Sequence, residues 1–305
     1  MSVSYVSALA AAKEAAADQH YPQGALYVVA TPIGNLADIS LRALHVLALA
    51  DTVACEDTRH TQQLLRAYGI DKTGGQLLAV HQHNEAEAAN AVTHLLRQGQ
   101  RVAYVSDAGT PGISDPGARL VAVAHAQGLR AIPLPGASSL TALLSVAGCA
   151  IDTGASAGFT FKGFLSNKAT ERSQQVTELA TVEHSVVLLE APHRIEATAL
   201  ALGVLGDRPV TVGRELTKQF EEIATVPASG LAAWFALDAN RLRGEFVLVL
   251  HPAAKQVQSG QEQRVLQLLL AELPLKTAVK LAADITGAPR NALYDLALTL
   301  KKAEG

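Results

Sequence analysis

Cysteines, aromatic residues and net charge are all scarce in this 305-residue chain, and each scarcity excludes a class of protein. Cys55 and Cys149 are the only cysteines. They lie too far apart for zinc-ligand spacing and indicate free thiols in a reducing compartment. Aromatic residues make up 4% of the chain, which argues against a large base-stacking surface. The net charge of −3 draws no polyanion by itself, so local basic clusters would have to hold one.

Membrane and targeting signals are missing as well. No apolar run reaches the roughly 18 residues that a spanning helix needs. The alanine-rich residues 1–24 lack the basic and continuous apolar regions of a signal peptide. We therefore expect a cytoplasmic protein whose residues 1–24 are a disordered or helical extension.

Several familiar catalytic motifs are also absent. The chain has no G-x-x-x-x-G-K-[ST] phosphate loop, no G-x-G-x-x-G dinucleotide fingerprint and no G-x-S-x-G elbow. The close histidines in His81-Gln82-His83 have no nearby carboxylate or cysteine, so we predict no metal site. Loops with backbone donors and hydroxyl groups remain, and these suit a cationic or zwitterionic cofactor better than a triphosphate.

The most informative stretch runs over residues 102–120, VAYVSDAGTPGISDPGARL. An apolar run predicts a buried strand, and Asp107–Gly117 cannot continue it because glycines and prolines dominate there. Asp115 is placed to cap a helix that has Pro116 at its first position. Strand, glycine loop and helix N-terminus together indicate a ligand site at the carboxyl end of a sheet. A long connection with two tight turns is the alternative.

The rest of the pattern predicts two α/β domains and a helical tail. Strands alternating with helices over residues 25–135 indicate a mainly parallel sheet. Residues 136–252 read as a second α/β domain with more antiparallel pairing. Its strands are expected at 159–165, 185–190, 209–215 and 245–250. After a polar linker at 252–263, residues 263–305 read as a helix–turn–helix appendage.

Seven short motifs occur in order and together resemble the tetrapyrrole-methylase fold family, specifically its members that modify small-subunit ribosomal RNA. They are PIGNL (32–36), ACEDTR (54–59), SDAGTPGISDPG (106–117), PLPGASS (133–139), EAPHRI (190–195), GRELTKQFEE (213–222) and RGEFVLVL (243–250). The tail resembles the same family. The resemblance implies S-adenosylmethionine in a cleft between two α/β domains, a homodimer and no metal. It also implies 2′-O-methylation of a cytidine in the decoding region of 16S rRNA.

The resemblance assigns site residues to the motifs. The expected cofactor contacts are Pro32, Gly34, Asp107, Gly109, Thr110, Gly112, Ser138, Ser139, Leu189, Glu190 and Gly213. The proton acceptor stays open between Glu56, Asp57, His193, Glu215 and Lys218. The expected RNA contacts are Arg59, Arg194, Arg214, Lys276, Lys280 and Arg290, with Lys218 as a further phosphate-clamp candidate.

Purely structural roles compete with several of these assignments. Asp107 could open an Asx turn, and Glu56 or Asp57 could cap the next helix. The tail could serve only as a docking element. Two other functions remain open: a small-molecule tetrapyrrole methylase of the same fold, and a non-catalytic RNA-binding assembly factor. The low aromatic content and the acidic net charge count against the second.

Overall fold

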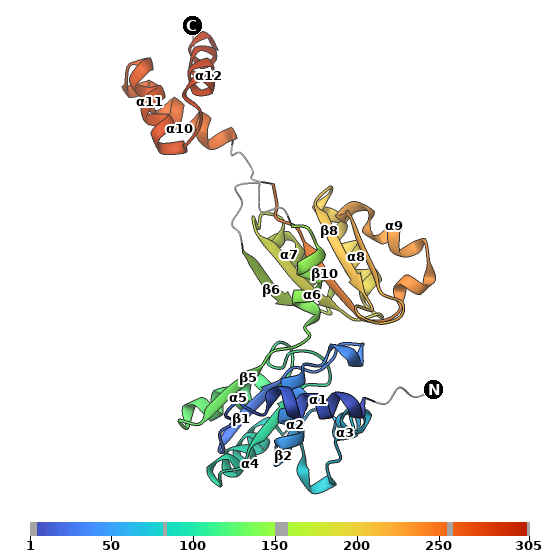
Figure 1. The fold of residues 1–305 in the computed structure, drawn as a ribbon. Coiled ribbons are helices and arrows are strands. Elements are labelled where there is room, and N and C mark those ends of the chain that lie inside the picture. The colour runs from blue at the N-terminus through green and yellow to red at the C-terminus, as the bar shows by residue number, and fades with distance from the viewer. Residues whose placement is uncertain (1–4, 82–83, 150–157, 255–258, 304–305) are drawn as a thin grey trace. The chain divides into compact units, whose positions relative to one another are not determined.

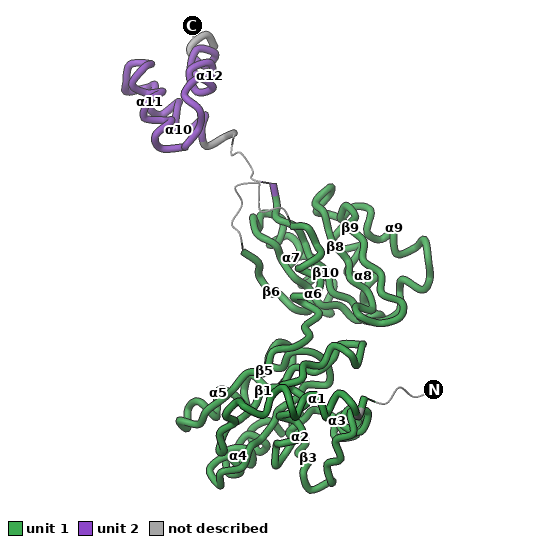
Figure 2. The backbone as a smooth tube through the Cα atoms, viewed as in Figure 1, with its two compact units in different colours: residues 1–253 green, residues 254–305 purple. Residues whose placement is uncertain are grey.

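The protein is described by a computed structural model that covers residues 5–81, 84–149, 158–254 and 259–303. The chain divides into two compact units, residues 1–253 and residues 254–305, which are coloured separately in Figure 2. The first unit contains both sheets, and the second contains helices.

The first sheet has five strands in the order β3-β2-β4-β1-β5, and every neighbouring pair is parallel. The strands are β1 (Ala25–Val29), β2 (Thr52–Cys55), β3 (Leu77–Ala79), β4 (Val102–Val105) and β5 (Arg130–Leu134). The predicted parallel α/β sheet is thus confirmed (Figure 1). β4 and β1 are neighbours in the middle of the sheet, so the loops that follow their carboxyl ends lie side by side.

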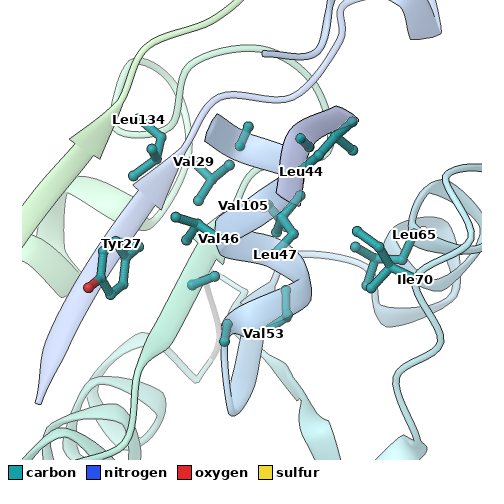
Figure 3. Packing of buried hydrophobic residues seen from close by; sticks show 14 of the residues in the cluster. Tyr27, Val29, Leu44, Val46, Leu47, Val53, Leu65, Ile70, Val105 and Leu134 are labelled. Atoms are coloured by element: carbon teal, nitrogen blue, oxygen red, sulfur yellow. The ribbon is translucent and has the colours of Figure 1, made fainter. Parts of the chain in front are cut away.

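Helices cover both faces of this sheet because side chains alternate along each strand. Tyr27 and Val29 of β1 pack with the helices of one face, while Leu26 packs with those of the other. Figure 3 shows Tyr27 and Val29 near Val46. The helices are α1 (Val6–Ala16), α2 (Leu41–Leu49) and α3 (Thr58–Ala67) on one face, and α4 (Glu85–Arg97) and α5 (Gly117–Ala126) on the other.

The second sheet has the order β6-β7-β10-β8-β9. Only β6 and β7 pair in parallel, and the other three pairs are antiparallel, as the sequence predicted. The strands are β6 (Phe159–Gly163), β7 (Ser185–Glu190), β8 (Pro209–Arg214), β9 (Glu222–Pro227) and β10 (Phe246–Leu250). β9 was not predicted. It is a half-exposed edge strand that ends in a proline, so its sequence lacks the apolar run that marks the buried strands.

One face of the second sheet is covered by α6 (Ser139–Val146), and the other by α7 (Ala169–Leu179), α8 (Ile195–Leu202) and α9 (Leu231–Ala236). Short 3-10 helices complete this unit: η1 (Leu36–Asp38), η2 (Gly74–Gln76), η3 (Gly203–Leu205), η4 (Ala228–Gly230) and η5 (Ala239–Leu242). Within the described part of the chain, no helix is both long and apolar enough to cross a membrane.

The second unit contains α10 (Ser259–Glu272), α11 (Leu275–Thr286) and α12 (Arg290–Ala303). Leu266, Val279 and Leu293 come from different helices and form a core of their own. Gly287 adopts a left-handed φ of 72° and ends α11, which confirms the predicted turn. The predicted linker was too long, because α10 already begins at Ser259. Its glutamine-rich first turns read as polar linker in the sequence.

Candidate active site

The loops after β1, β2 and β4 are joined by backbone and carboxylate hydrogen bonds. Thr31 N–H donates to Gly109 O at 2.9 Å, and Gly109 N–H donates to Thr31 O at 3.1 Å. Asp107 N–H donates to Glu56 Oε1 at 3.1 Å, and Asp57 N–H donates to Asp107 Oδ1 at 3.2 Å. Three segments that are distant in sequence therefore form one rigid edge at the carboxyl end of the sheet.

Asp115 holds the glycine-rich loop in shape. Its carboxylate accepts hydrogen bonds from Tyr104 Oη at 2.9 Å, from Gly112 N–H at 2.6 Å and from Gly117 N–H at 2.8 Å. Gly109 and Gly112 have φ values of 83° and 87°, which residues with a Cβ rarely adopt. α5 begins at Gly117, with Pro116 at the cap position, so the predicted helix starts one residue later than expected.

A cavity of about 220 Å³ lies against this loop, and we call it the glycine-loop cavity. Three carboxyl side chains line it, together with five hydroxyl side chains and no lysine, arginine or histidine among the described residues. Its lining comprises Ile33, Glu56, Ser106, Asp107, Ala108, Gly109, Thr110, Ile113, Ser114, Asp115, Ser138, Ser139, Leu140, Phe161 and Leu189. Such a wall favours a cation and repels a polyphosphate.

The hydroxyl groups of Ser138 and Ser139 belong to this wall. Ser138 occupies the N-cap position of α6, yet its side chain forms no capping hydrogen bond. Thr110 Oγ1 instead donates to Ala137 O at 2.9 Å, which joins the glycine loop to the start of α6. Gly136 allows the chain before α6 to pass close to the end of β1, because a Cβ there would come within 2.9 Å of Ala30 Cβ.

Glu56 is the titratable group of the cavity with an altered proton affinity. Its burial raises the pKa of the carboxyl group, and the nearby Asp107 and Asp115 carboxylates raise it further. The hydrogen bond from Asp107 N–H opposes this shift and orients the carboxylate. Glu56 therefore combines a fixed position with a raised pKa, which are the two properties of a general base.

A second cavity, of about 370 Å³, is mainly apolar and extends over the end of the second sheet. We call it the second-sheet cavity. It shares Ile33, Ala108, Ser139 and Leu189 with the glycine-loop cavity. Its remaining lining comprises Phe164, Glu190, Ala191, Pro192, Leu216, Glu245, Phe246 and Val247.

A third cavity, of about 480 Å³, lies against helix α3 and is called the α3 cavity. It shares Ile33, Asp107 and Ala108 with the glycine-loop cavity and Glu245 with the second-sheet cavity. Its remaining lining comprises Pro32, Gly34, Leu36, His60, Gln63, Leu64, Ala67 and Lys218. The three cavities therefore meet at Ile33 and Ala108.

The loop between β8 and β9 reaches across to the first sheet. Asn35 N–H donates to Thr217 Oγ1 at 3.2 Å, and a Cβ on Gly34 would lie only 2.4 Å from Lys218 Cγ. Glu215 and Thr217 have left-handed φ values of 50° and 66°. Such backbone strain in residues other than glycine is typical of functional loops.

Lys218, in this loop, pairs with two carboxylates. Its Nζ lies 2.8 Å from Glu215 Oε1 and 2.9 Å from Glu245 Oε2. Partial burial disfavours the charged amine, but these two hydrogen bonds outweigh it and raise the pKa of Lys218. An amine held protonated in this way is a poor proton acceptor and a poor partner for a phosphate.

Arg194 and Arg214, two of the expected RNA contacts, are also engaged inside the protein. Arg214 pairs with Glu222 at 3.6 Å and donates to Phe220 O at 3.2 Å. Arg194 pairs with Glu190 at 3.1 Å and donates to Leu165 O. The side chain of Arg214 is 10% exposed and that of Arg194 is 16% exposed, so the structure gives both a packing role.

Four further predicted residues also have structural roles or lie away from the cavities. Asp57 caps α3 by accepting from Arg59 N–H at 2.7 Å and is absent from the cavity walls. Those hydrogen bonds lower the pKa of Asp57. Gly213 is buried where a Cβ would meet Leu143 at 2.7 Å. His193 is exposed at the start of α8, and Glu190 accepts hydrogen bonds from Ala191 N–H and Thr198 Oγ1.

The predicted RNA contacts of the tail differ in their surroundings. Lys276 and Lys280 are exposed one turn apart on α11, whereas Arg290 pairs with Asp284 at 3.0 Å.

The sequence patterns did not predict every part of the cavity walls. Ser106, Ser114 and Asp115 lie inside the glycine motif and could have been included. The contribution of α3 could not be foreseen, because its spacing reads as an ordinary amphipathic helix.

Comparison with known proteins shows which family shares this sequence and fold. Residues 25–232 match the family model described as tetrapyrrole (corrin/porphyrin) methylases, and residues 256–301 match the model described as the RsmI C-terminal HTH domain. The chain is 46% identical over 282 residues to ribosomal RNA small subunit methyltransferase I of Neisseria meningitidis serogroup A, covering 91% of this chain and 94% of that one. It is also 46% identical to the Pseudomonas aeruginosa protein of that name, covering 90% and 97%.

A solved structure gives independent support for the fold. Uroporphyrin-III C-methyltransferase from Thermus thermophilus, complexed with S-adenosylhomocysteine, matches with a TM-score of 0.50 and 19% identity. The match covers 74% of this chain and 96% of that one. With the family models and the relatives, it leads to one conclusion: the chain belongs to the tetrapyrrole methylases and, within them, to the ribosomal RNA small subunit methyltransferase I family.

Proposed function

We propose that this protein transfers a methyl group from S-adenosylmethionine to the ribose 2′-hydroxyl of a cytidine in the decoding region of 16S rRNA. The relatives' shared name supports a small-subunit rRNA substrate. The observation that carries the proposal is the glycine-loop cavity, with its carboxylates and hydroxyls at the carboxyl end of a parallel sheet.

The cavity's donor set fits this cofactor. S-adenosylmethionine, when bound, supplies a methyl group already activated on a positively charged sulfur. Asp107, with the backbone at Gly109, would hold the polar part, and the hydroxyls of Ser138 and Ser139 would add contacts. Gly112, whose N–H donates to Asp115, shapes the loop. Thr110 keeps the loop and α6 together. The continuous apolar wall through Leu189 into the second-sheet cavity suits the adenosine portion.

Glu56 is our choice of proton acceptor among the candidates. A ribose hydroxyl becomes a better nucleophile when a positioned base takes its proton. Glu56 lines the cavity with a raised pKa, whereas Asp57 caps a helix and Lys218 is held protonated. A hydroxyl loses its proton when it receives a methyl group. The assignment of Glu56 as the base and the proposed 2′-O-methylation therefore support each other.

The substrate is testable with labelled cofactor. Small ribosomal subunits that lack the modification are incubated with the protein and tritiated S-adenosylmethionine, and the rRNA is then digested. We expect label in one cytidine, within a dinucleotide resistant to alkali because its 2′-hydroxyl is blocked. Label released as a base-methylated nucleotide would contradict the 2′-O assignment. A parallel incubation replaces the subunits with a precorrin-type tetrapyrrole, and label that enters only the tetrapyrrole would favour the small-molecule alternative.

Two further features of the family resemblance belong to this proposal. We infer that the protein acts in the cytoplasm, where ribosomes are assembled, and that it forms a homodimer. Light scattering of the purified protein tests the second point. A mass equal to one chain at working concentration would contradict it. We also infer that the exposed Lys276 and Lys280 of the second unit contact rRNA phosphates.

A further inference from the structure

The α3 cavity is distinct in character from the other two. The glycine-loop and second-sheet cavities share four lining residues and together accommodate a molecule with a charged and an apolar end. The α3 cavity meets them only at Ile33, Ala108, Asp107 and Glu245. At about 480 Å³ it has the size of small-molecule sites, which span about 300–1,000 Å³.

One face of α3 forms much of this cavity. His60, Gln63, Leu64 and Ala67 are spaced three and four residues apart, so they lie on one side of the helix. Leu36 and Leu64 offer apolar contact, and the exposed amide of Gln63 offers both a donor and an acceptor. The apolar walls suit the face of a nucleobase. The Gln63 amide suits its edge, and His60, Asp107, Lys218 and Glu245 add polar groups for the rest of the nucleotide.

The rim of the same helix is positively charged. Arg59 and Arg66 lie four residues before and three residues after Gln63 and are exposed, and α3 contains no acidic residue. Neither arginine forms a salt bridge with any residue that the structure describes. About 10 Å of helix axis separates them. They contrast with Arg194, Arg214 and Lys218, whose charges are already neutralised by carboxylates.

From these contacts we infer that the α3 cavity receives the target nucleotide, turned out of its stack, while Arg59 and Arg66 bind the phosphates on either side. The inference rests on the proposed function and adds the subsite and its specificity residue, Gln63. Enzymes that carry out chemistry on a base extrude its nucleotide into a pocket, and the α3 cavity has the size and the walls for such a nucleotide. The wall shared at Asp107 and Ala108 then brings donor and acceptor sites together, beside Glu56.

Filling the cavity is the first test. Ala67→Leu adds side-chain volume at the half-buried end of α3. We expect kcat/KM for small subunits to fall at least about tenfold, while calorimetric affinity for S-adenosylmethionine stays unchanged. Gln63→Ala, which truncates an exposed side chain, should lower kcat/KM without changing thermal stability. Unchanged methylation in both variants would overturn the inference, and so would an equal loss of cofactor affinity.

Removing the rim charges is the second test. A fluorescent single-stranded oligoribonucleotide that carries the target sequence reports binding by anisotropy at several salt concentrations. Arg59→Ala and Arg66→Ala should each reduce the slope of log affinity against log salt by about one, because each removes one phosphate contact. The matched control is Arg97→Ala, an exposed arginine on α4 that lines none of the three cavities. Slopes equal to the control's would overturn the assignment.

The two measurements also separate this inference from the proposed function. If the unaltered protein labels no subunit, the methylation proposal fails. The nucleotide pocket then still stands if Ala67→Leu and Arg66→Ala weaken oligoribonucleotide binding relative to Arg97→Ala. If they do not, the pocket fails as well.

Discussion

Two charged regions lie at the ends of the two sheets, and they use their charges in opposite ways. At the ends of the second sheet, Arg194, Arg214 and Lys218 each face a carboxylate within 4 Å. At the ends of the first sheet, Glu56 and Asp107 receive hydrogen bonds from backbone N–H groups, and Arg59 is exposed. The first arrangement stabilises the fold. The second leaves charge available for a cofactor, a proton or a phosphate.

The comparison teaches that a basic motif is not equivalent to a basic surface. GRELTKQFEE and EAPHRI contain arginine and lysine, but also the glutamates that neutralise them. Helix α3 (TRHTQQLLRA) contains no acidic residue, and the carboxylate of its N-cap, Asp57, accepts hydrogen bonds from the backbone N–H groups of Arg59 and His60. Whether a carboxylate pairs with the guanidinium in the folded protein is therefore more informative than the arginine itself.

The largest expected effect is on catalysis at the first sheet. Glu56→Gln keeps the shape and the acceptor for Asp107 N–H but cannot take a proton, so we expect the methylation rate to fall about 10²- to 10⁴-fold. Cofactor affinity should change little. Single-turnover assays with labelled cofactor measure this, with Glu87→Gln on the exposed face of α4 as the control. A rate close to that of the parent would remove Glu56 from the reaction.

The raised pKa of Glu56 predicts that the methylation rate depends on pH. A base acts only when ionised, so activity should be lost as pH falls through the pKa of Glu56. Because burial raises that pKa, the loss should begin at a higher pH than an ordinary glutamate would give. A pH–rate profile under single-turnover conditions measures this limb. Its persistence in Glu56→Gln would assign it to another group.

The second region should respond in stability. Arg214→Ala leaves the carbonyls of Phe220 and Arg243 without this donor, while Glu222 keeps only its pair with Arg241, so we expect a loss of about 2 kcal/mol in the free energy of unfolding. Arg243→Ala, at the neighbouring exposed position, should change stability by about 0.5 kcal/mol or less. Urea titrations of both variants measure the difference. Equal free energies of unfolding for the two variants would contradict the structural role of the second region.

Asp107→Ala should affect ligand binding more than folding. It removes a carboxylate from the glycine-loop cavity and one exposed hydrogen bond to Asp57 N–H. We expect cofactor affinity to fall about 10- to 100-fold, as for a lost hydrogen bond to a charged group. Calorimetric titration measures it, with the exposed Asp71→Ala as the control. Unchanged affinity would exclude Asp107 from the cofactor site.

The smallest effect is expected from removing the second unit. A truncated protein ending at Ala253 loses the exposed Lys276 and Lys280 but keeps both sheets. Cofactor affinity should stay unchanged, while KM for small subunits rises several-fold and depends less on salt. Full activity would exclude an RNA role for the tail. Loss of solubility or of cofactor binding would instead indicate that the tail stabilises the rest.

The chain's local patterns were sufficient for much of the fold. Apolar runs bounded by glycine and proline located the parallel strands, because a strand buried on both faces requires apolar residues throughout. The glycine-rich loop after β4 was recognisable for a similar reason, since its backbone needs left-handed φ values at Gly109 and Gly112. β9 was missed and the start of α10 was placed too late, because neither β9 nor the first turns of α10 carry a continuous apolar run.

The distribution of roles within the site was decided only by tertiary structure. The sequence placed Glu56, Asp57, Arg194 and Lys218 in motifs, but their availability depends on partners brought close by folding. Asp57 is taken by the start of α3, and Lys218 by Glu215 and Glu245. Glu56 is left facing a cavity whose walls come from several loops. Motifs determine which groups are present, and packing determines which of them remain free, because hydrogen bonds and ion pairs form wherever the fold brings two groups within reach.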